Sequence, residues 1–147
     1  MTGFKKLEVE AIIAAVKTWA KQQPEIYAVA LVGSWARNQA HENSDIDLMI
    51  LTPEFERFFS NTNWINSIPW HDLNLKVDRY YDRTYGVVTS RHLCFQQGQR
   101  IEFGFGYPSW ANINPIDPGT LAVISSGIKI ICDRDRLLKT LLKEIKI

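Results

Sequence analysis

Cysteine is scarce in this chain, which has only two among its 147 residues, at Cys94 and Cys132. So low a count excludes a disulfide-rich scaffold, and the two positions fit neither a CxxC motif nor the spacing of a cysteine metal site. We interpret both as reduced thiols in the core of a cytoplasmic protein, with a structural disulfide as the alternative.

The chain also lacks a surplus of charge and a long apolar run. Its 17 Lys and Arg residues offset 16 Asp and Glu residues, so the composition predicts no general affinity for nucleic acid or for a membrane surface. No apolar run approaches the length of a membrane span, and the first residues lack the hydrophobic region of a signal peptide. Without repeats or a linker, this length predicts a single domain over residues 1–147.

The hydrophobic patterns predict an α/β fold, a mixed sheet with helices mainly on one face. Apolar residues at helical spacing and the breaker Pro24 define the first helix, and alternation defines the later strands. The predicted order is a helix over 5–22, a strand over 27–33, a short helix from 34, a loop over 41–44, a strand over 45–51, a helix over 54–68, three strands between 73 and 106, a loop over 107–120, one or two helical turns before 127, a strand over 128–133 and a helix over 134–146.

Gly33 and Ser34 stand where the first strand is predicted to end and a helix to begin. Glycine allows a ligand to approach the backbone closely, and the free N–H groups of a helix start favour an anion such as phosphate. Ser34 adds a hydroxyl that can bind a phosphate oxygen or cap the helix. Alone, the pair is weak evidence for a phosphate site, because most such pairs form ordinary turns.

Asp45 and Asp47 share one face of the strand predicted over 45–51, because side chains alternate along a strand. Two neighbouring carboxylates suit a hard divalent cation, and Mg²⁺ is typically held by one or two carboxylates together with substrate phosphates. The alternative is a simple turn at Asn43 and Ser44, with Asp47 pointing into solvent.

A third carboxylate strengthens the interpretation as a metal site. In RIEFGF the apolar residues alternate with Glu102, so Glu102 faces the side of Asp45 and Asp47 if both strands contact one core. Three acids beside a phosphate-binding turn would form a two-metal phosphoryl-transfer site. Asp78 is a rival for the third position, and Glu102 could instead be a solvated acid paired with Arg100. The three histidines are not spaced as ligands of one metal, so none is assigned a role.

The pattern of Gly33-Ser34, ten intervening residues and then Asp45-Ile46-Asp47 resembles the signature of the DNA polymerase beta-like nucleotidyltransferase superfamily. The chain is most similar to the small stand-alone members, over about residues 29–102. Arg37 also fits the family pattern, whereas Asn38 stands where many members have glycine. The resemblance implies transfer of a nucleoside monophosphate, AMP from ATP, from a Mg²⁺-bound triphosphate to a hydroxyl group, with release of pyrophosphate.

The resemblance also implies roles for individual residues. Gly33 and Ser34 would bind the β- and γ-phosphates, Arg37 would contact phosphate, and the acids Asp45, Asp47 and Glu102 would bind metal and act in catalysis.

The chain has no counterpart of the helical domain by which larger relatives bind their acceptor. The acceptor pocket would then come from the loop over 107–120, from a second copy in a homo-oligomer, or from another protein. Small family members are often antitoxins encoded beside a helical HEPN-type toxin, so such a toxin is an expected partner. The alternative function is a non-catalytic module of this fold, an antitoxin acting by occlusion or a nucleotide sensor.

Overall fold

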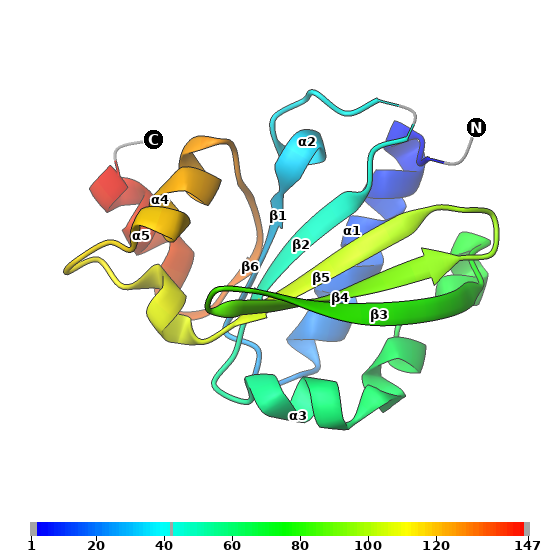
Figure 1. Cartoon of the computed structure of the whole chain (residues 1–147), viewed down its shortest axis with the longest axis horizontal. Helices are drawn as coiled ribbons and strands as arrows, with labels where there is room; N and C mark the ends of the chain where they lie inside the picture. Colours follow the sequence, from blue (N-terminus) through cyan, green and yellow to red (C-terminus); the bar gives the residue numbers. More distant parts are fainter. Residues whose placement is uncertain (1–2, 42, 146–147) are drawn as a thin grey trace.

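The computed structural model of the chain describes residues 3–41 and 43–145 and shows a six-stranded sheet with helices packed on it (Figure 1). The strand order is β3-β4-β5-β2-β1-β6; β2 and β5 run parallel, and the other neighbouring pairs run antiparallel. The predicted α/β class with a mixed sheet is therefore confirmed. The strands are β1 (Ala28–Val32), β2 (Ile46–Leu51), β3 (Val77–Tyr85), β4 (Val88–Phe95), β5 (Arg100–Gly106) and β6 (Lys129–Asp133).

Helices lie on both faces of the sheet, with α1 behind it and α4 and α5 to one side in Figure 1. The α-helices are α1 (Lys6–Lys21), α2 (Gly33–Ala36), α3 (Phe55–Ser60), α4 (Pro118–Ser125) and α5 (Leu137–Ile145). Four short 3-10 helices, η1 (Thr62–Ser67), η2 (Trp70–Leu73), η3 (Pro108–Ala111) and η4 (Arg134–Arg136), complete the set. No helix in the described parts of the chain is long and apolar enough to cross a membrane.

The alternation of side chains along the strands divides the core between the two faces of the sheet. On one face, Ile46, Leu48 and Ile50 of β2 pack in a common cluster with α1, α3, η1 and η2. On the other face, Met49 and Leu51 pack with η3, α4 and α5, which cover only the part of the sheet around β1 and β2. Near the start of β2, this second face carries Asp47 at the position that precedes Met49, and not an apolar residue.

Three predicted elements differ from the structure. The helix expected over 54–68 ends at Ser60, because Asn61 has an extended backbone and its side chain accepts a hydrogen bond from Asn63 N, which starts η1. The loop expected over 107–120 contains η3 and the start of α4, whose N-cap is Asp117. The last helix starts at Leu137, after Asp135 and Arg136 in left-handed conformations. Glu42 of the predicted loop and Lys146 of the predicted helix lie outside the described residues.

Candidate active site

A row of side chains crosses five strands on the face opposite α1. The strand registers place Val32 opposite Asp47, Asp47 opposite Glu102, and Glu102 opposite His92. The row ends at Tyr81 on β3, which lies opposite His92 and stacks on its ring at 4.6 Å. Partners in register project from the same face of a sheet. The row therefore joins the residue that precedes the Gly33–Ser34 turn to a pair of acids and then to a histidine.

The third carboxylate beside Asp47 is that of Glu102. The two residues are direct neighbours on the parallel strands β2 and β5, as the alternation in both sequences predicts. Asp78, the rival candidate, lies on β3, three strands away from β2, at an irregularity between Val77 and Arg79. The Arg100 guanidinium binds Asp45, at 3.2 Å, and not Glu102. Asp47 and Glu102 therefore form the centre of the candidate site, and Asp45 lies at its edge.

The environment of Asp47 disfavours its negative charge. The pKa of this carboxyl is raised from 3.8 to about 7: burial contributes most, the neighbouring carboxylates of Glu102 and Asp45 also raise it, and Arg37 lowers it. Glu102 also shares a hydrogen bond with Asp47 that favours the protonated form. Near neutral pH, the Asp47 carboxyl therefore holds a proton in part of the molecules, and a bound cation could replace that proton. A bound cation would stabilise the ionised form of these carboxylates.

Gly33 lets the backbone of the turn approach the acid pair. Its φ angle is +75°, and a Cβ placed on it would lie only 2.3 Å from Oδ2 of Asp47. Real Cβ atoms do not approach an oxygen so closely, so any side chain here would displace the carboxylate. Glycine is required at this position for both its conformation and the space it leaves.

Gly33→Ala should lower the free energy of unfolding by about 2–3 kcal/mol, because the new methyl group collides with Asp47 in a conformation that alanine disfavours. Urea denaturation measures this loss. The matched control is Gly86→Ala, since Gly86 has a φ of +63° but no atom within 4 Å of its added Cβ. The control isolates the conformational cost, about 1 kcal/mol. Equal losses in the two variants would show that the approach of Gly33 to Asp47 carries no strain.

The turn around Ser34 differs in one respect from the prediction. The helix α2 begins at Gly33 with Val32 as its N-cap, and no side chain caps it, so Ser34 lies inside the turn and is not its cap. Arg37 ends the turn, is exposed, and donates from Nε to Gln39 Oε1. Asn38 has a φ of 57°, a left-handed conformation that asparagine accepts better than most residues. This conformation explains how asparagine replaces the glycine of related sequences.

His92 also belongs to the row and was not predicted as a site residue from the sequence. Its side chain is only 10% exposed, and Nε2 lies 3.0 Å from Oε1 of Glu102. The contact is not aligned as a hydrogen bond, and Nε2 is among the buried polar atoms without a hydrogen-bond partner in the described residues. The signal was the alternation in β4, where Arg91 points to the opposite face and bonds the Phe58 carbonyl.

The oxygen ligands at this site fit a magnesium ion that takes its remaining ligands from a substrate and from water. Asp47 and Glu102 provide two adjacent carboxylates, and the negative charge of Glu102 disfavours ionisation of Asp47. Among the described residues, no group of three or more His, Cys, Asp or Glu side chains forms a complete cage for a metal ion. Mg²⁺ typically uses one or two protein carboxylates and completes its shell with phosphate oxygens and water, so two adjacent acids are sufficient protein ligands for it.

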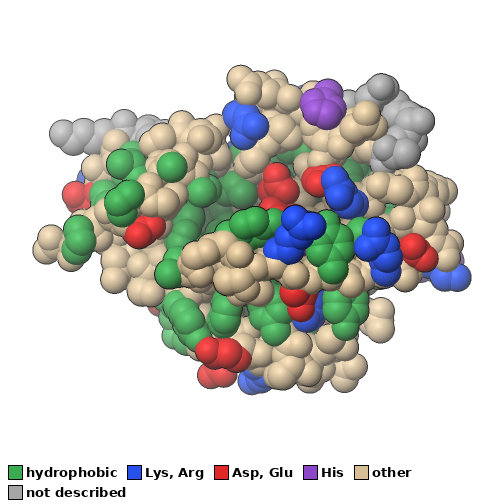
Figure 2. Space-filling model, in the orientation of Figure 1, with side chains coloured by type: hydrophobic (Ala, Val, Ile, Leu, Met, Phe, Trp, Pro, Cys, Tyr) green, Lys and Arg blue, Asp and Glu red, His purple; other side chains and the backbone are tan. Residues whose placement is uncertain are grey.

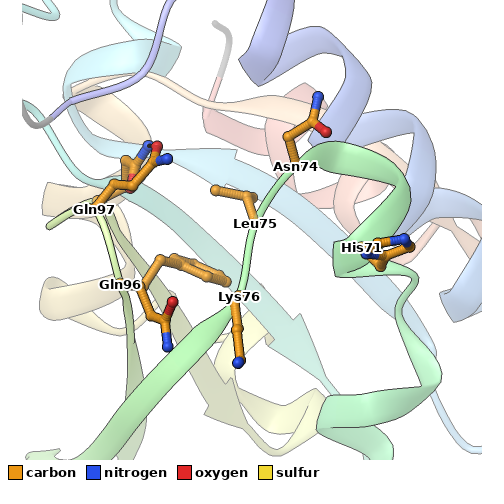
Figure 3. A pocket seen from close by; sticks show the side chains of 8 residues that line it. His71, Asn74, Leu75, Lys76, Gln96 and Gln97 are labelled. Atoms are coloured by element: carbon orange, nitrogen blue, oxygen red, sulfur yellow. Dashed lines mark hydrogen bonds between the residues drawn. The ribbon is translucent and has the colours of Figure 1, made fainter.

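A hollow lies between the segment 71–76 and the turn after β4 (Figure 3). Its labelled side chains come from these two segments and are mostly polar, among them Asn74, Gln96 and Gln97. The hollow measures about 170 Å³ and none of the candidate site residues lines it. It is separate from the acid pair.

Comparison with known proteins defines the class of this chain. Residues 12–93 match the nucleotidyltransferase domain family, and the chain belongs to that family. It is 34% identical over 74 residues to a protein of Methanocaldococcus jannaschii named "Putative protein adenylyltransferase MJ1215", covering 48% of this chain and 81% of that one. A second protein of that organism with the same description, MJ0128, is 31% identical over 74 residues, covering 48% of this chain and 71% of its own length. The predicted superfamily is confirmed.

Solved structures resemble the chain more distantly. An aminoglycoside 6-adenyltransferase from Bacillus subtilis is 16% identical with a TM-score of 0.49, and covers 74% of this chain. The chain spans only 37% of the length of that enzyme. A toxin-antitoxin structure with AMP-PNP is 11% identical with a TM-score of 0.49, covering 91% of this chain and 84% of its own. At these scores neither structure defines a substrate or a partner for this chain.

Proposed function

We propose that the protein is a Mg²⁺-dependent nucleotidyltransferase that moves AMP from ATP to a hydroxyl group of a protein or small molecule and releases pyrophosphate. The observation that carries the proposal is the pairing of Asp47 with Glu102 directly beside the Gly33 backbone. Membership of the nucleotidyltransferase domain family supports the reaction class.

The phosphates of ATP have a place at the turn that follows β1. We assign the β- and γ-phosphates to the backbone of Gly33 and to the Ser34 hydroxyl, with Arg37 as an additional positive charge. The positive charge of Arg37 lowers the pKa of Asp47, which supports this role. Because Gly33 lies against Asp47, phosphates held at the turn would lie next to the two acids.

We propose that Mg²⁺ is held by the carboxylates of Asp45, Asp47 and Glu102, which would bind either one or two ions. The ion would neutralise the triphosphate and stabilise charge that develops during transfer. Glu102 would accept the proton of the attacking hydroxyl as its oxygen bonds to the α-phosphorus and the bond to the β-phosphate oxygen breaks. Asp45 would reach the ion only after leaving Arg100, which it binds at 3.2 Å.

The choice of ATP and of a protein acceptor rests on the two archaeal relatives, whose names describe protein adenylyltransferases. A HEPN-type toxin as the acceptor, and a second copy of the chain as part of the acceptor pocket, stay predictions. The non-catalytic alternative is disfavoured by the position of Glu102. A module that only binds has no need of a third acid in register with Asp47, whereas transfer needs a base beside the metal ligands.

Binding of Mg²⁺-ATP should raise the melting temperature of the wild type. At a ligand concentration one hundred times the dissociation constant, binding stabilises the folded state by about 2.7 kcal/mol, which corresponds to several degrees in a chain of this size. Differential scanning fluorimetry with each nucleoside triphosphate, with Mg²⁺ and with EDTA, measures the effect and identifies the preferred base. Asp47→Asn should lose the Mg²⁺-dependent part of the shift.

The same scan includes Asp78→Asn as its control, because that carboxylate lies on β3, three strands away from β2. Its shift should equal that of the wild type. A wild-type protein that shows no shift with any triphosphate would contradict the proposed function.

A further inference from the structure

A tyrosine stands at the end of the row of site residues, on the side away from the Gly33 turn. Tyr81 lies opposite His92 in register, and the two rings stack with their centres 4.6 Å apart and their planes inclined by 7°. Its neighbour Tyr80 points to the other face of the sheet, where the Arg91 guanidinium lies 4.7 Å from its ring centre. Tyr81 is half-buried. The stacking therefore holds the Tyr81 ring against the row.

The hydroxyl group of Tyr81 lies on the side of the acids. The pKa of Arg100 on β5 is raised chiefly by the charge of Asp45, and a hydrogen bond with Tyr81 also contributes. Because β4 separates β3 from β5, this hydrogen bond crosses a whole strand. The same guanidinium lies 3.2 Å from Oδ2 of Asp45. One arginine therefore links the phenol of Tyr81 to a carboxylate of the candidate site.

Three arginines surround this phenol. Arg79 and Arg83 flank Tyr81 along β3, with guanidinium carbons 5.7 and 5.4 Å from the centre of its ring, and Arg100 is the third. All three arginines are exposed. Figure 2 shows basic side chains gathered around a hydrophobic patch, next to acidic side chains, in the middle of this face. Guanidinium groups bind phosphate oxygens, so this arrangement suits a phosphate group carried by the Tyr81 oxygen.

The direction of phosphoryl transfer follows the row across the strands. The attacking oxygen, the α-phosphorus and the leaving oxygen lie roughly in line. In the proposed function pyrophosphate leaves toward Gly33, so the attacking group comes from beyond Glu102. Neighbouring strands lie about 4.8 Å apart, which puts the backbone of Tyr81 about 10 Å from that of Glu102, within the combined reach of two side chains. Tyr81 therefore stands on the side from which the attacking hydroxyl comes.

We infer that the protein, when it holds Mg²⁺-ATP without an external acceptor, transfers AMP to the hydroxyl group of its own Tyr81. This inference rests on the proposed function. The bond from Tyr81 Oη to the α-phosphorus forms while the bond from the α-phosphorus to the bridging oxygen of the β-phosphate breaks. Glu102 takes the phenolic proton, and pyrophosphate leaves with the electron pair of the broken bond. AMP on Tyr81 would cover the acceptor side of the row, so the modified chain would be closed to other acceptors.

Intact-mass spectrometry of the purified protein, incubated with Mg²⁺ and ATP and no acceptor, tests the inference. We expect the wild type to gain the mass of a single AMP, and peptide mapping to locate it on Tyr81. Tyr81→Phe keeps the ring that stacks on His92 and removes the nucleophile, so it should stay unmodified. The matched control is Tyr80→Phe, which removes a hydroxyl group from the opposite face and should be modified as the wild type is. If Tyr81→Phe fails to fold, the location of AMP on the wild type decides.

A thermal shift with Mg²⁺-ATP on the same samples separates the two claims. A wild type that is stabilised by Mg²⁺-ATP but gains no AMP overturns the inference and leaves the proposed function standing. AMP located on another residue, such as Tyr85, overturns the inference as well. Asp47→Asn mixed with Tyr81→Phe should stay unmodified, and AMP on either chain would overturn the intramolecular step. A wild type that is neither stabilised nor modified overturns the proposed function and the inference with it.

Discussion

Asp47→Asn should reduce nucleotidyl transfer by at least about a thousandfold, because the amide removes one of the two adjacent charges available to a metal at the centre of the row. Asparagine keeps the size of the side chain, so the loss reports charge and not packing. Release of pyrophosphate from ATP, measured in the presence of Mg²⁺ and candidate acceptors, gives the rate. The variant should remain folded.

Asp78→Asn is the control for this experiment. It removes a carboxylate that sequence alone could not distinguish from Glu102, and that the fold places on the edge strand β3. Its rate should lie within about twofold of the wild type, since a solvated surface acid contributes little to a distant reaction. Loss of activity in Asp78→Asn together with normal activity in Asp47→Asn would place the metal site elsewhere.

The same Asp47→Asn substitution should stabilise the protein in the absence of divalent ions. The pKa of Asp47 is about 7 in the folded protein, against an ordinary value of 3.8. The folded state therefore binds a proton more tightly than the unfolded state, and the wild type loses stability as the pH rises from about 4 to 7. Asparagine carries no charge and avoids this loss. Partial solvation of the site limits the gain, which we expect to be about 1–2 kcal/mol at pH 8.

Urea denaturation of both proteins in EDTA at pH 4.5 and pH 8 measures this difference. The free energy of unfolding of D47N should exceed that of the wild type by more at pH 8 than at pH 4.5. Addition of Mg²⁺ and ATP should then reverse the order at pH 8. If the difference in the free energy of unfolding between D47N and the wild type is the same at both pH values, the surroundings of Asp47 do not disfavour its negative charge.

The sequence predicted the centre of the site because strand alternation is a local property. The phases of DIDLMI and RIEFGF, each fixed by its apolar residues, were enough to put Glu102 on the side of Asp47. The register between the two strands was not available from either pattern, because β2 and β5 are parallel neighbours separated by two other strands in the chain. The structure supplies it.

The remaining parts of the site depend on contacts between distant segments. His92 joins Glu102 only through the pairing of β4 with β5, and a single histidine in a strand of mixed polarity gives no sign of such a neighbour. Helix α4 begins inside a segment that looks like a loop because it is rich in proline and asparagine. The cap at Asp117 and the proline that follows it mark that helix in retrospect.

The most direct test of the account is a crystal structure of the protein with Mn²⁺ and α,β-methylene-ATP. Mn²⁺ accepts the same oxygen ligands as Mg²⁺ and is visible by its anomalous scattering. We expect an anomalous peak within about 2.5 Å of carboxylate oxygens of both Asp47 and Glu102, with the β- and γ-phosphates at Gly33 and Ser34. A peak bound by other residues, or a triphosphate bound away from α2, would contradict the assignment of this row as the active site.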